Sequence, residues 1–138
     1  MNNENNYNLK KDIELLNWSK IKIKINNLNN YPKFFKEREI WWASLGSNIG
    51  DEEDGKNRNF ERPILILKIF NKELIIGIPL TSRVGNNAFY YNLKKPNRGA
   101  LIFSQLRALS SKRLIRRMSK ISKAEALVIL ELLIKKLQ

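Results

Sequence analysis

Residues 64–80 read ILILKIFNKELIIGIPL, two apolar runs rich in β-branched residues with a short polar segment between them. Residues 64–70 and 74–80 therefore predict two antiparallel strands, and Asn71-Lys72 is placed to turn the chain between them. The run ILIL has no polar face, so it must be covered on both sides. This pattern favours a small β-barrel over an open sheet.

Three more short segments outside this hairpin have the composition of strands, namely residues 40–43, 89–93 and 100–104. Short strands separated by brief turns fit the same barrel. The fold class predicted by these segments is therefore mainly β, within the α+β class.

The C-terminal part of the chain changes to a helical period. Ser122 and Glu125 form a capping box, in which the Ser side chain accepts from the Glu amide and the Glu carboxylate reaches back to the Ser amide. This predicts a helix over residues 123–136. We expect the helix to pack across the barrel through one apolar face, formed by Leu127, Leu130, Ile134 and Leu137.

Residues 1–36 differ from the rest, because ten Asn residues fall in the first thirty positions and Gly is absent there. We expect residues 1–36 to form an N-terminal extension that is in part helical, and residues 37–138 to form one domain. Asn8 is placed to cap a short amphipathic helix. Residues 20–25 fit a helix or a strand equally, since their isoleucines alternate with lysines, and residues 26–32 read as a linker.

Composition narrows the function classes. The formal net charge of +13 favours polyanions such as RNA, DNA or an acidic protein, although a Lys-rich and Asn-rich genome is an alternative source of the charge. With no Cys and no His, disulfides, thiolate nucleophiles and imidazole acid–base chemistry are excluded. No apolar run approaches the roughly 18 residues that span a bilayer, so we expect a cytoplasmic protein without a membrane partner.

Arg62 is the leading candidate for phosphate chemistry. RNA is cleaved without metal when its 2′-hydroxyl attacks the adjacent phosphorus, and the planar guanidinium suits the charge that develops on the phosphate oxygens. Pro63 fixes the backbone beside Arg62. A purely structural alternative is a local ion pair to Glu61 or Asp54. Thr81 follows a strand end broken by a proline, where its hydroxyl is free to contact a phosphate.

Several motifs in order resemble the MazF/PemK family of toxin endoribonucleases. They are REIWWASLGSNIG from residue 38, the DEEDG loop, ERPILIL, GIPLTSR, and QLRALSSKRL from residue 105. The resemblance covers residue 37 to the C-terminus. It implies an SH3-like β-barrel and a sequence-specific, metal-independent enzyme without cofactor. Such an enzyme cleaves single-stranded mRNA, inhibits translation and growth, acts as a homodimer and is bound by a cognate antitoxin.

The resemblance also assigns candidate site residues. Arg62 and Thr81 match the catalytic pair of the family. Residues 46–61 resemble its substrate loop, in which carboxylates accept hydrogen bonds from base amino groups, although a solvated flexible loop is an alternative. Glu53 stands where the family has Gln, and Ser104 where some relatives carry a carboxylate. The candidate substrate-binding residues are Glu52, Glu53, Ser82, Arg83, Ser104, Gln105 and Arg107.

Two readings from other classes remain open at the sequence level. A basic stretch from Lys112 to Lys123 fits RNA binding, and residues 89–91 offer aromatic rings either for stacking on bases or for the core. A noncatalytic nucleic-acid-binding module, or a gyrase poison on the same barrel, would fit these features too. The presence of both Arg62 and Thr81 favours catalysis over these alternatives.

Overall fold

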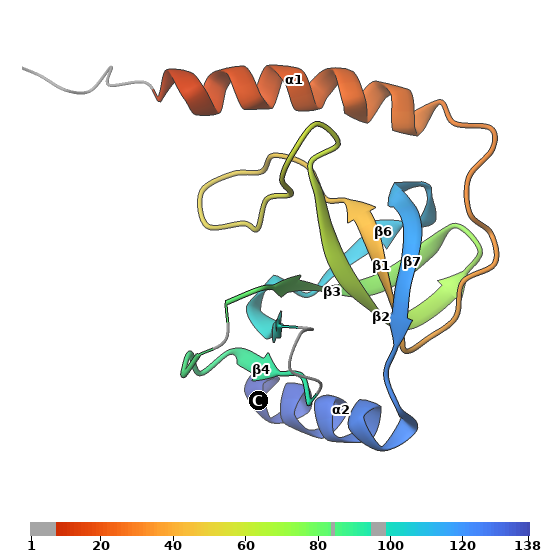
Figure 1. The fold of residues 1–138 in the computed structure, drawn as a ribbon, viewed down its shortest axis with the longest axis vertical. Coiled ribbons are helices and arrows are strands. Elements are labelled where there is room, and N and C mark those ends of the chain that lie inside the picture. The colour runs from red at the N-terminus through yellow and green to blue at the C-terminus, as the bar shows by residue number, and fades with distance from the viewer. Residues whose placement is uncertain (1–7, 84, 95–98) are drawn as a thin grey trace, which may run out of the picture.

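A computed structural model describes residues 8–83, 85–94 and 99–138 of the chain. In this part, two α-helices flank seven β-strands (Figure 1). The elements are α1 (Leu9–Asn26), β1 (Glu39–Ser44), β2 (Glu61–Asn71), β3 (Leu74–Thr81), β4 (Tyr90–Asn92), β5 (Ala100–Ile102), β6 (Arg107–Ser110), β7 (Leu114–Lys120) and α2 (Lys123–Leu137), with 3-10 turns at Phe103–Gln105 and Ser111–Arg113.

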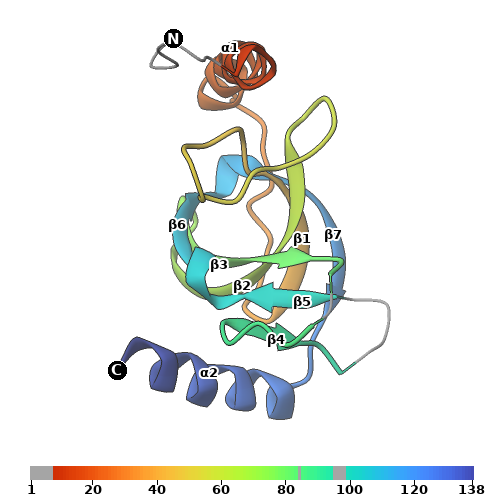
Figure 2. The same ribbon diagram turned by 90° about the vertical axis from the view of Figure 1, so that its left-hand side faces the viewer.

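The seven strands form one antiparallel sheet, in which six follow the order β4-β5-β3-β2-β1-β7 and β6 pairs with β3. The strand β3 pairs with β2 along one edge and with two strands along the other edge. On that second edge its first half pairs with β6 and its last two residues pair with β5. The sheet therefore curls strongly, as Figures 1 and 2 show. The predicted mainly β, α+β class and the barrel-like shape are confirmed, although the pairing among the described residues does not close into a ring.

Two strands were absent from the sequence prediction. The strand β7 carries the run LIRRMSK, whose residues 115–118 are exposed, so it lacks the apolar alternation that identified the others. The strand β6 is four residues long. The predicted strand over residues 100–104 stops at Ile102, because Phe103–Gln105 turn into a 3-10 helix.

The core lies on both sides of the sheet, in two clusters of buried apolar residues. One cluster joins the sheet to α2 and includes Ile40, Leu65, Leu101, Ile129 and Leu133. The other lies on the opposite side and consists of Phe35, Trp41, Ala43, Leu45, Ile64, Ile66, Ile75, Leu109 and Leu114. The double coverage predicted for the ILIL run is therefore found in the structure.

The predicted packing face of α2 is wrong. Leu127, Leu130, Ile134 and Leu137 are 43 to 68% exposed, whereas the buried residues of the helix are Glu125, Ile129 and Leu133. The helix is apolar around most of its circumference, so its period does not select a single face. Ser122 Oγ accepts from Glu125 N as predicted, but the Glu125 carboxylate accepts from Tyr91 Oη and Lys94 N.

Residues 8–36, the described part of the N-terminal extension, contain a single α-helix, and residues 20–25 belong to it. Asn8 caps α1 by accepting a hydrogen bond from Lys11 N, as predicted. In Figures 1 and 2, α1 lies across one end of the sheet and α2 across the other. The segment beneath α1 is residues 45–60, here called the acidic loop, which connects β1 to β2. No helix in the described ranges is long and apolar enough to cross a membrane.

Candidate active site

Arg62 and Thr81 lie side by side at the ends of neighbouring strands. The antiparallel register that pairs Ile64 with Pro79 brings Arg62, two residues earlier, alongside Thr81, two residues later. Both line one open cavity of about 580 Å³. The other residues that line it are Trp42, Lys56, Asn57, Glu61, Pro63, Leu80, Ser82, Gly99 and Met118.

The Arg62 guanidinium is held on three sides by the protein. Nε donates to Asp54 O at 2.7 Å, Nη1 donates to Leu80 O at 3.0 Å, and Nη2 pairs with Glu53 Oε1 at 2.8 Å. The side chain is only 11% exposed. A planar fork fixed at each nitrogen keeps one orientation, which is the condition for aligning a phosphate.

The ion-pair partner of Arg62 differs from both residues considered in the sequence analysis. Asp54 contributes only its backbone carbonyl to Arg62, and Glu61 pairs with Arg116 at 2.9 Å. The ion-pair partner of Arg62 is Glu53. A local ion pair of Arg62 is therefore present, and it belongs to the same loop that was expected to contact substrate.

The Thr81 side chain shapes the turn that follows β3. Its Oγ1 accepts from Arg83 N at 3.2 Å. The hydroxyl proton therefore remains free of this bond and is available to a ligand in the cavity. Ser82 and Arg83 are exposed beside Thr81, and Ser82 lines the same cavity while Arg83 does not.

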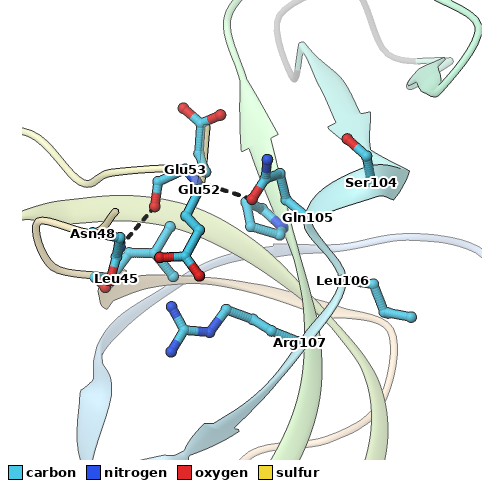
Figure 3. Close-up of a pocket in the computed structure, with 9 residues that line it drawn as sticks. Leu45, Asn48, Glu52, Glu53, Ser104, Gln105, Leu106 and Arg107 are labelled. Carbon is cyan, nitrogen blue, oxygen red and sulfur yellow. Dashed lines mark hydrogen bonds between the residues drawn. The ribbon is translucent and has the colours of Figure 1, made fainter. Parts of the chain in front are cut away.

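A second cavity, of about 320 Å³, brings together five of the predicted substrate-binding residues. Its lining consists of Glu52, Glu53, Ser104, Gln105 and Arg107 with Leu45, Asn48, Pro79 and Leu106. Figure 3 shows Gln105 and Arg107 extending toward the acidic loop, with Ser104 at the far side. The sequence prediction grouped these residues from two segments about fifty positions apart, and the structure places them around one hollow.

The Gln105 side chain ties this cavity to the acidic loop. Its Oε1 accepts from Glu53 N at 2.9 Å, and its Nε2 donates to Asp51 O at 2.8 Å. Both ends of the amide are therefore engaged with backbone on either side of Glu52. In this state Gln105 positions the loop, a role that the sequence did not suggest.

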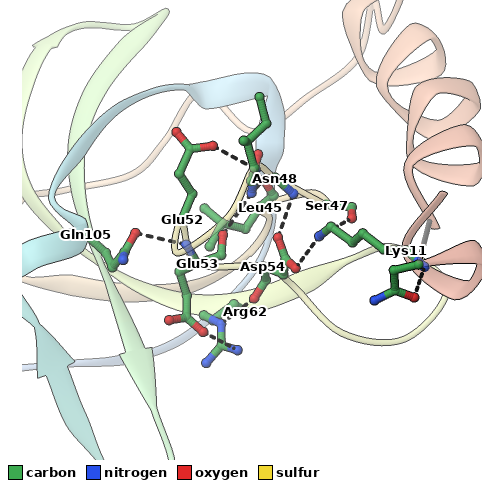
Figure 4. Close-up of polar contacts among 11 residues, drawn as sticks. Lys11, Leu45, Ser47, Asn48, Glu52, Glu53, Asp54, Arg62 and Gln105 are labelled. Atoms are coloured by element: carbon green, nitrogen blue, oxygen red, sulfur yellow. Dashed lines mark hydrogen bonds and ion pairs between the residues drawn. The ribbon is translucent and has the colours of Figure 1, made fainter. Parts of the chain in front are cut away.

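The acidic loop is internally bonded, in contrast to the solvated flexible loop considered as an alternative. Asp54 Oδ1 accepts from Asn48 N at 2.6 Å, and Asn48 Nδ2 donates to Leu45 O and Glu53 O. Glu52 Oε1 accepts from Ile49 N at 2.8 Å (Figure 4). Asp54 was not a predicted site residue, and its sequence neighbours gave no signal that separated it from the other loop carboxylates.

Much of the predicted basic surface is paired within the protein. Arg117 Nε lies 2.8 Å from Glu39 Oε2, and Arg113 Nη1 donates to Ser44 O and Leu45 O. Burial lowers the pKa of Arg113 to about 10, and the neighbouring Arg107 cation adds to the shift. At neutral pH this guanidinium is still charged, so the site keeps its positive field.

Two aromatic residues at and next to β4, Tyr91 and Phe89, divide between the two roles considered. Tyr91 packs against the core, with its ring stacked on Phe103 at a centroid distance of 6.2 Å. Phe89 is 45% exposed, and Lys136 Nζ lies 5.7 Å from its ring centroid. Stacking on a base is therefore open to Phe89 and closed to Tyr91 in this arrangement.

These features describe a site suited to anionic ligands. A fixed guanidinium and a threonine hydroxyl share one cavity, and carboxylates and an amide line the next. The described residues contain no group of three or more Cys, Asp or Glu side chains that could hold a metal ion. The available chemistry is charge stabilisation and hydrogen bonding by Arg, Thr and carboxylate groups.

Comparison with known proteins identifies relatives of this fold. The profile of the PemK-like, MazF-like toxins of type II toxin-antitoxin systems matches residues 36–137. Comparison with curated proteins gave no match.

Solved structures with the same fold include MazF (Form-I) from Deinococcus radiodurans, with a TM-score of 0.59 and 18% identity over 79% of this chain and 98% of that one. An endoribonuclease in complex with its cognate antitoxin from Mycobacterial species gives 0.55 and 14% over 75% and 95% of the two chains. MazE-MazF (Form-II) from Deinococcus radiodurans gives 0.55 and 16% over 79% and 97%.

Proposed function

Because the chain belongs to the family of PemK-like, MazF-like toxins of type II toxin-antitoxin systems, we propose that it is an endoribonuclease that cleaves single-stranded RNA. In this proposal Arg62 and Thr81 are its catalytic residues. The reaction is attack by the RNA 2′-hydroxyl on the adjacent phosphorus, with expulsion of the 5′-oxygen of the next nucleotide. Cleavage of mRNA at short sequences then inhibits translation and growth.

The observation that carries the proposal is the shared cavity of Arg62 and Thr81. A guanidinium held in one orientation stabilises the negative charge on the phosphorane oxygens without reorganising during the reaction. The Thr81 hydroxyl is not required for this charge stabilisation and serves to orient the phosphate. No metal ion takes part in these steps.

The adjoining cavity supports a role in reading bases. Glu52 and Glu53 present carboxylates that accept hydrogen bonds from exocyclic amino groups, and Gln105 and Arg107 supply donors. Ser82 in the first cavity, Ser104 in the second and the exposed Arg83 beside Thr81 complete the proposed substrate contacts. Because Glu53 replaces the family's Gln, we expect a base preference different from that of relatives with the amide.

We further propose a cognate antitoxin and a homodimer as the protein partners. A net charge of +13 complements an acidic, partly disordered antitoxin segment. The exposed apolar face of α2, formed by Leu127, Leu130, Ile134 and Leu137, supports self-association, because a solvated helix rarely carries such a stripe without a partner.

The test is cleavage of a long single-stranded RNA in the presence of a chelator, with mapping of the fragment ends. We expect discrete cuts ending in cyclic phosphate. Arg62→Ala should lower kcat by about 100- to 1,000-fold, the usual loss for one oxyanion donor. RNA affinity should change by less than about tenfold, since one phosphate contact is lost.

The matched control is Arg58→Ala, which removes the same charge from an exposed position of the acidic loop. It should cleave at the wild-type rate. Equal activity of Arg62→Ala and Arg58→Ala would remove Arg62 from the mechanism. Intact RNA with the wild-type protein would favour a noncatalytic binding module, and activity lost on chelation would exclude the metal-independent chemistry.

A further inference from the structure

The N-terminal helix α1 lies outside the residues matched by the family profile, yet it packs directly on the acidic loop. Its one buried residue is Trp18, which is 6% exposed. The Trp18 ring meets Phe60 edge-on, with a centroid distance of 5.6 Å, and Arg113 lies over its face at 5.7 Å. The helix is therefore seated between the end of the acidic loop and the turn that precedes β7.

The loop is shaped to receive this helix. Gly46 has a φ of +100°, and a Cβ there would lie 2.5 Å from Trp18 Cε2. Phe60 has a φ of +50°, in the left-handed region that residues with a side chain rarely adopt. Phe60 precedes Arg62 by two residues, and its carbonyl accepts from Leu45 N and Gly46 N. Trp18 thus packs on Phe60, whose backbone conformation sets the position from which the chain enters β2 and reaches Arg62.

A polar contact from α1 leads to the same arginine. Lys11 Nζ lies 2.7 Å from Asp54 Oδ2 and 2.9 Å from Ser47 Oγ. Asp54 in turn offers its carbonyl to Arg62 Nε, and the adjacent Glu53 pairs with Arg62 Nη2. Figure 4 shows these side chains in sequence, from Lys11 on α1 to Arg62 on β2.

The state held by these contacts is closed to substrate. Glu53 occupies the Nη2 edge of Arg62, and its carboxylate repels a phosphate that approaches this edge. Glu53 lines one cavity and Arg62 the other, so their ion pair also stands between the two cavities. An RNA strand that uses both must first separate Glu53 from Arg62, while the bond from Arg62 Nη1 to Leu80 O on β3 keeps the guanidinium oriented.

We propose that α1 is a strap that holds the acidic loop closed over Arg62, with Lys11 and Trp18 as its positioning residues. Loosening the strap shifts the loop toward an open state in which Arg62 is free to bind phosphate. The inference rests on the proposed ribonuclease function for its consequence, but the contact between α1 and the loop is measurable without it.

The test compares Lys11→Met with Lys10→Met in the full-length chain. Both remove one charge from α1, but Lys10 is exposed and Lys11 is the residue at Asp54. Lys11→Arg is the conservative variant, because it keeps a cation that reaches the same carboxylate. Hydrogen exchange is followed at the loop amides of Asn48, Glu53 and Gly55. Asn48 N and Gly55 N donate within the loop, and Glu53 N donates to Gln105.

Lys11→Met should speed exchange of these amides about two- to fivefold over Lys10→Met, with the amides of β2 and β3 unchanged. The side chains of Lys11 and Asp54 are 26% and 37% exposed, which limits the stabilisation from their ion pair. A two- to fivefold change in exchange corresponds to about 0.4 to 1 kcal/mol, which is within that limit. The KM for RNA should fall by a similar factor while kcat stays within about twofold, because a larger fraction of molecules is competent to bind. Lys11→Arg should restore both values.

Equal loop exchange in the Lys11→Met and Lys10→Met proteins would overturn the strap, and so would a KM that rises in Lys11→Met alone. If the wild-type protein cleaves no RNA, the proposed function fails, and the exchange ratio still decides whether α1 holds the loop. The two failures are therefore distinguishable.

Discussion

Replacing Gly46 by Ala should undock α1 while leaving the sheet folded. The added Cβ would lie 2.5, 2.6 and 2.8 Å from three atoms of the Trp18 ring. Contacts this short force one partner to move. Neither core cluster contains a residue of α1, so departure of Trp18 with its helix disturbs the domain least.

The size of the effect follows from the burial of Trp18. A buried Trp removes about 150 to 250 Å² from water, worth about 4 to 6 kcal/mol as an upper estimate. Losing about 3 kcal/mol of this would lower the protection of α1 amides about 100-fold. A free 18-residue helix is marginal in water, so α1 should also lose helical content once it undocks.

Peptide-resolved hydrogen exchange measures this directly, and a red shift in tryptophan emission reports exposure of Trp18. The control is Gly50→Ala, because Gly50 also has a positive φ, of +55°, but has no atom within 4 Å of an added Cβ. Both variants carry the same kind of backbone strain, and only one meets Trp18. Equal protection of α1 in the two proteins would refute the seating of Trp18 on Gly46.

Two further predictions concern α2. Burial, followed by the charge and hydrogen bond of Glu125, raises the pKa of Tyr91 to about 12, so its neutral form is favoured in the folded state. The resulting contribution to the free energy of unfolding is complete below about pH 10 and is lost as the pH rises toward 12. Tyr91→Phe should therefore flatten the pH dependence of stability between about pH 10 and 12, measured by denaturant unfolding. An unchanged pH dependence would contradict this. Leu130→Glu places a carboxylate on the exposed apolar face of α2 and should convert the proposed homodimer to monomer in sedimentation equilibrium, with the unfolding free energy of the monomer changed by less than about 0.5 kcal/mol. A dimer of unchanged affinity would exclude this face from the interface.

The sequence predicted the elements that depend on local signals, such as a run of strand-forming residues or a helix-capping side chain. The hairpin of residues 64–80, the Asn8 cap and the Ser122 cap each depend on neighbours within a few positions. The face of α2 was wrong because apolar residues surround that helix, and only the shape of the sheet selects Ile129 and Leu133 for burial.

The residues of the candidate site could be predicted from the sequence, but the contacts that hold them in the structure could not. Arg62 and Thr81 were expected together, and both line one cavity. Their catalytic role stays a prediction. The sequence did not predict the ion pairs Glu53–Arg62 and Lys11–Asp54. The second pair joins residues 43 positions apart and depends on where α1 docks.

The pairing of β1 with β7 has a consequence for synthesis of the chain. The strand β1 is made early, but one of its two partners is the last strand of the sheet. A nascent chain that stops before Leu114 leaves an open edge on β1, and such edges recruit other chains. A nascent chain that stops before Arg113 also lacks the guanidinium that lies over Trp18. The β2-β3 hairpin that carries Arg62 and Thr81 can form on the ribosome well before the sheet and the docking surface for α1 are complete.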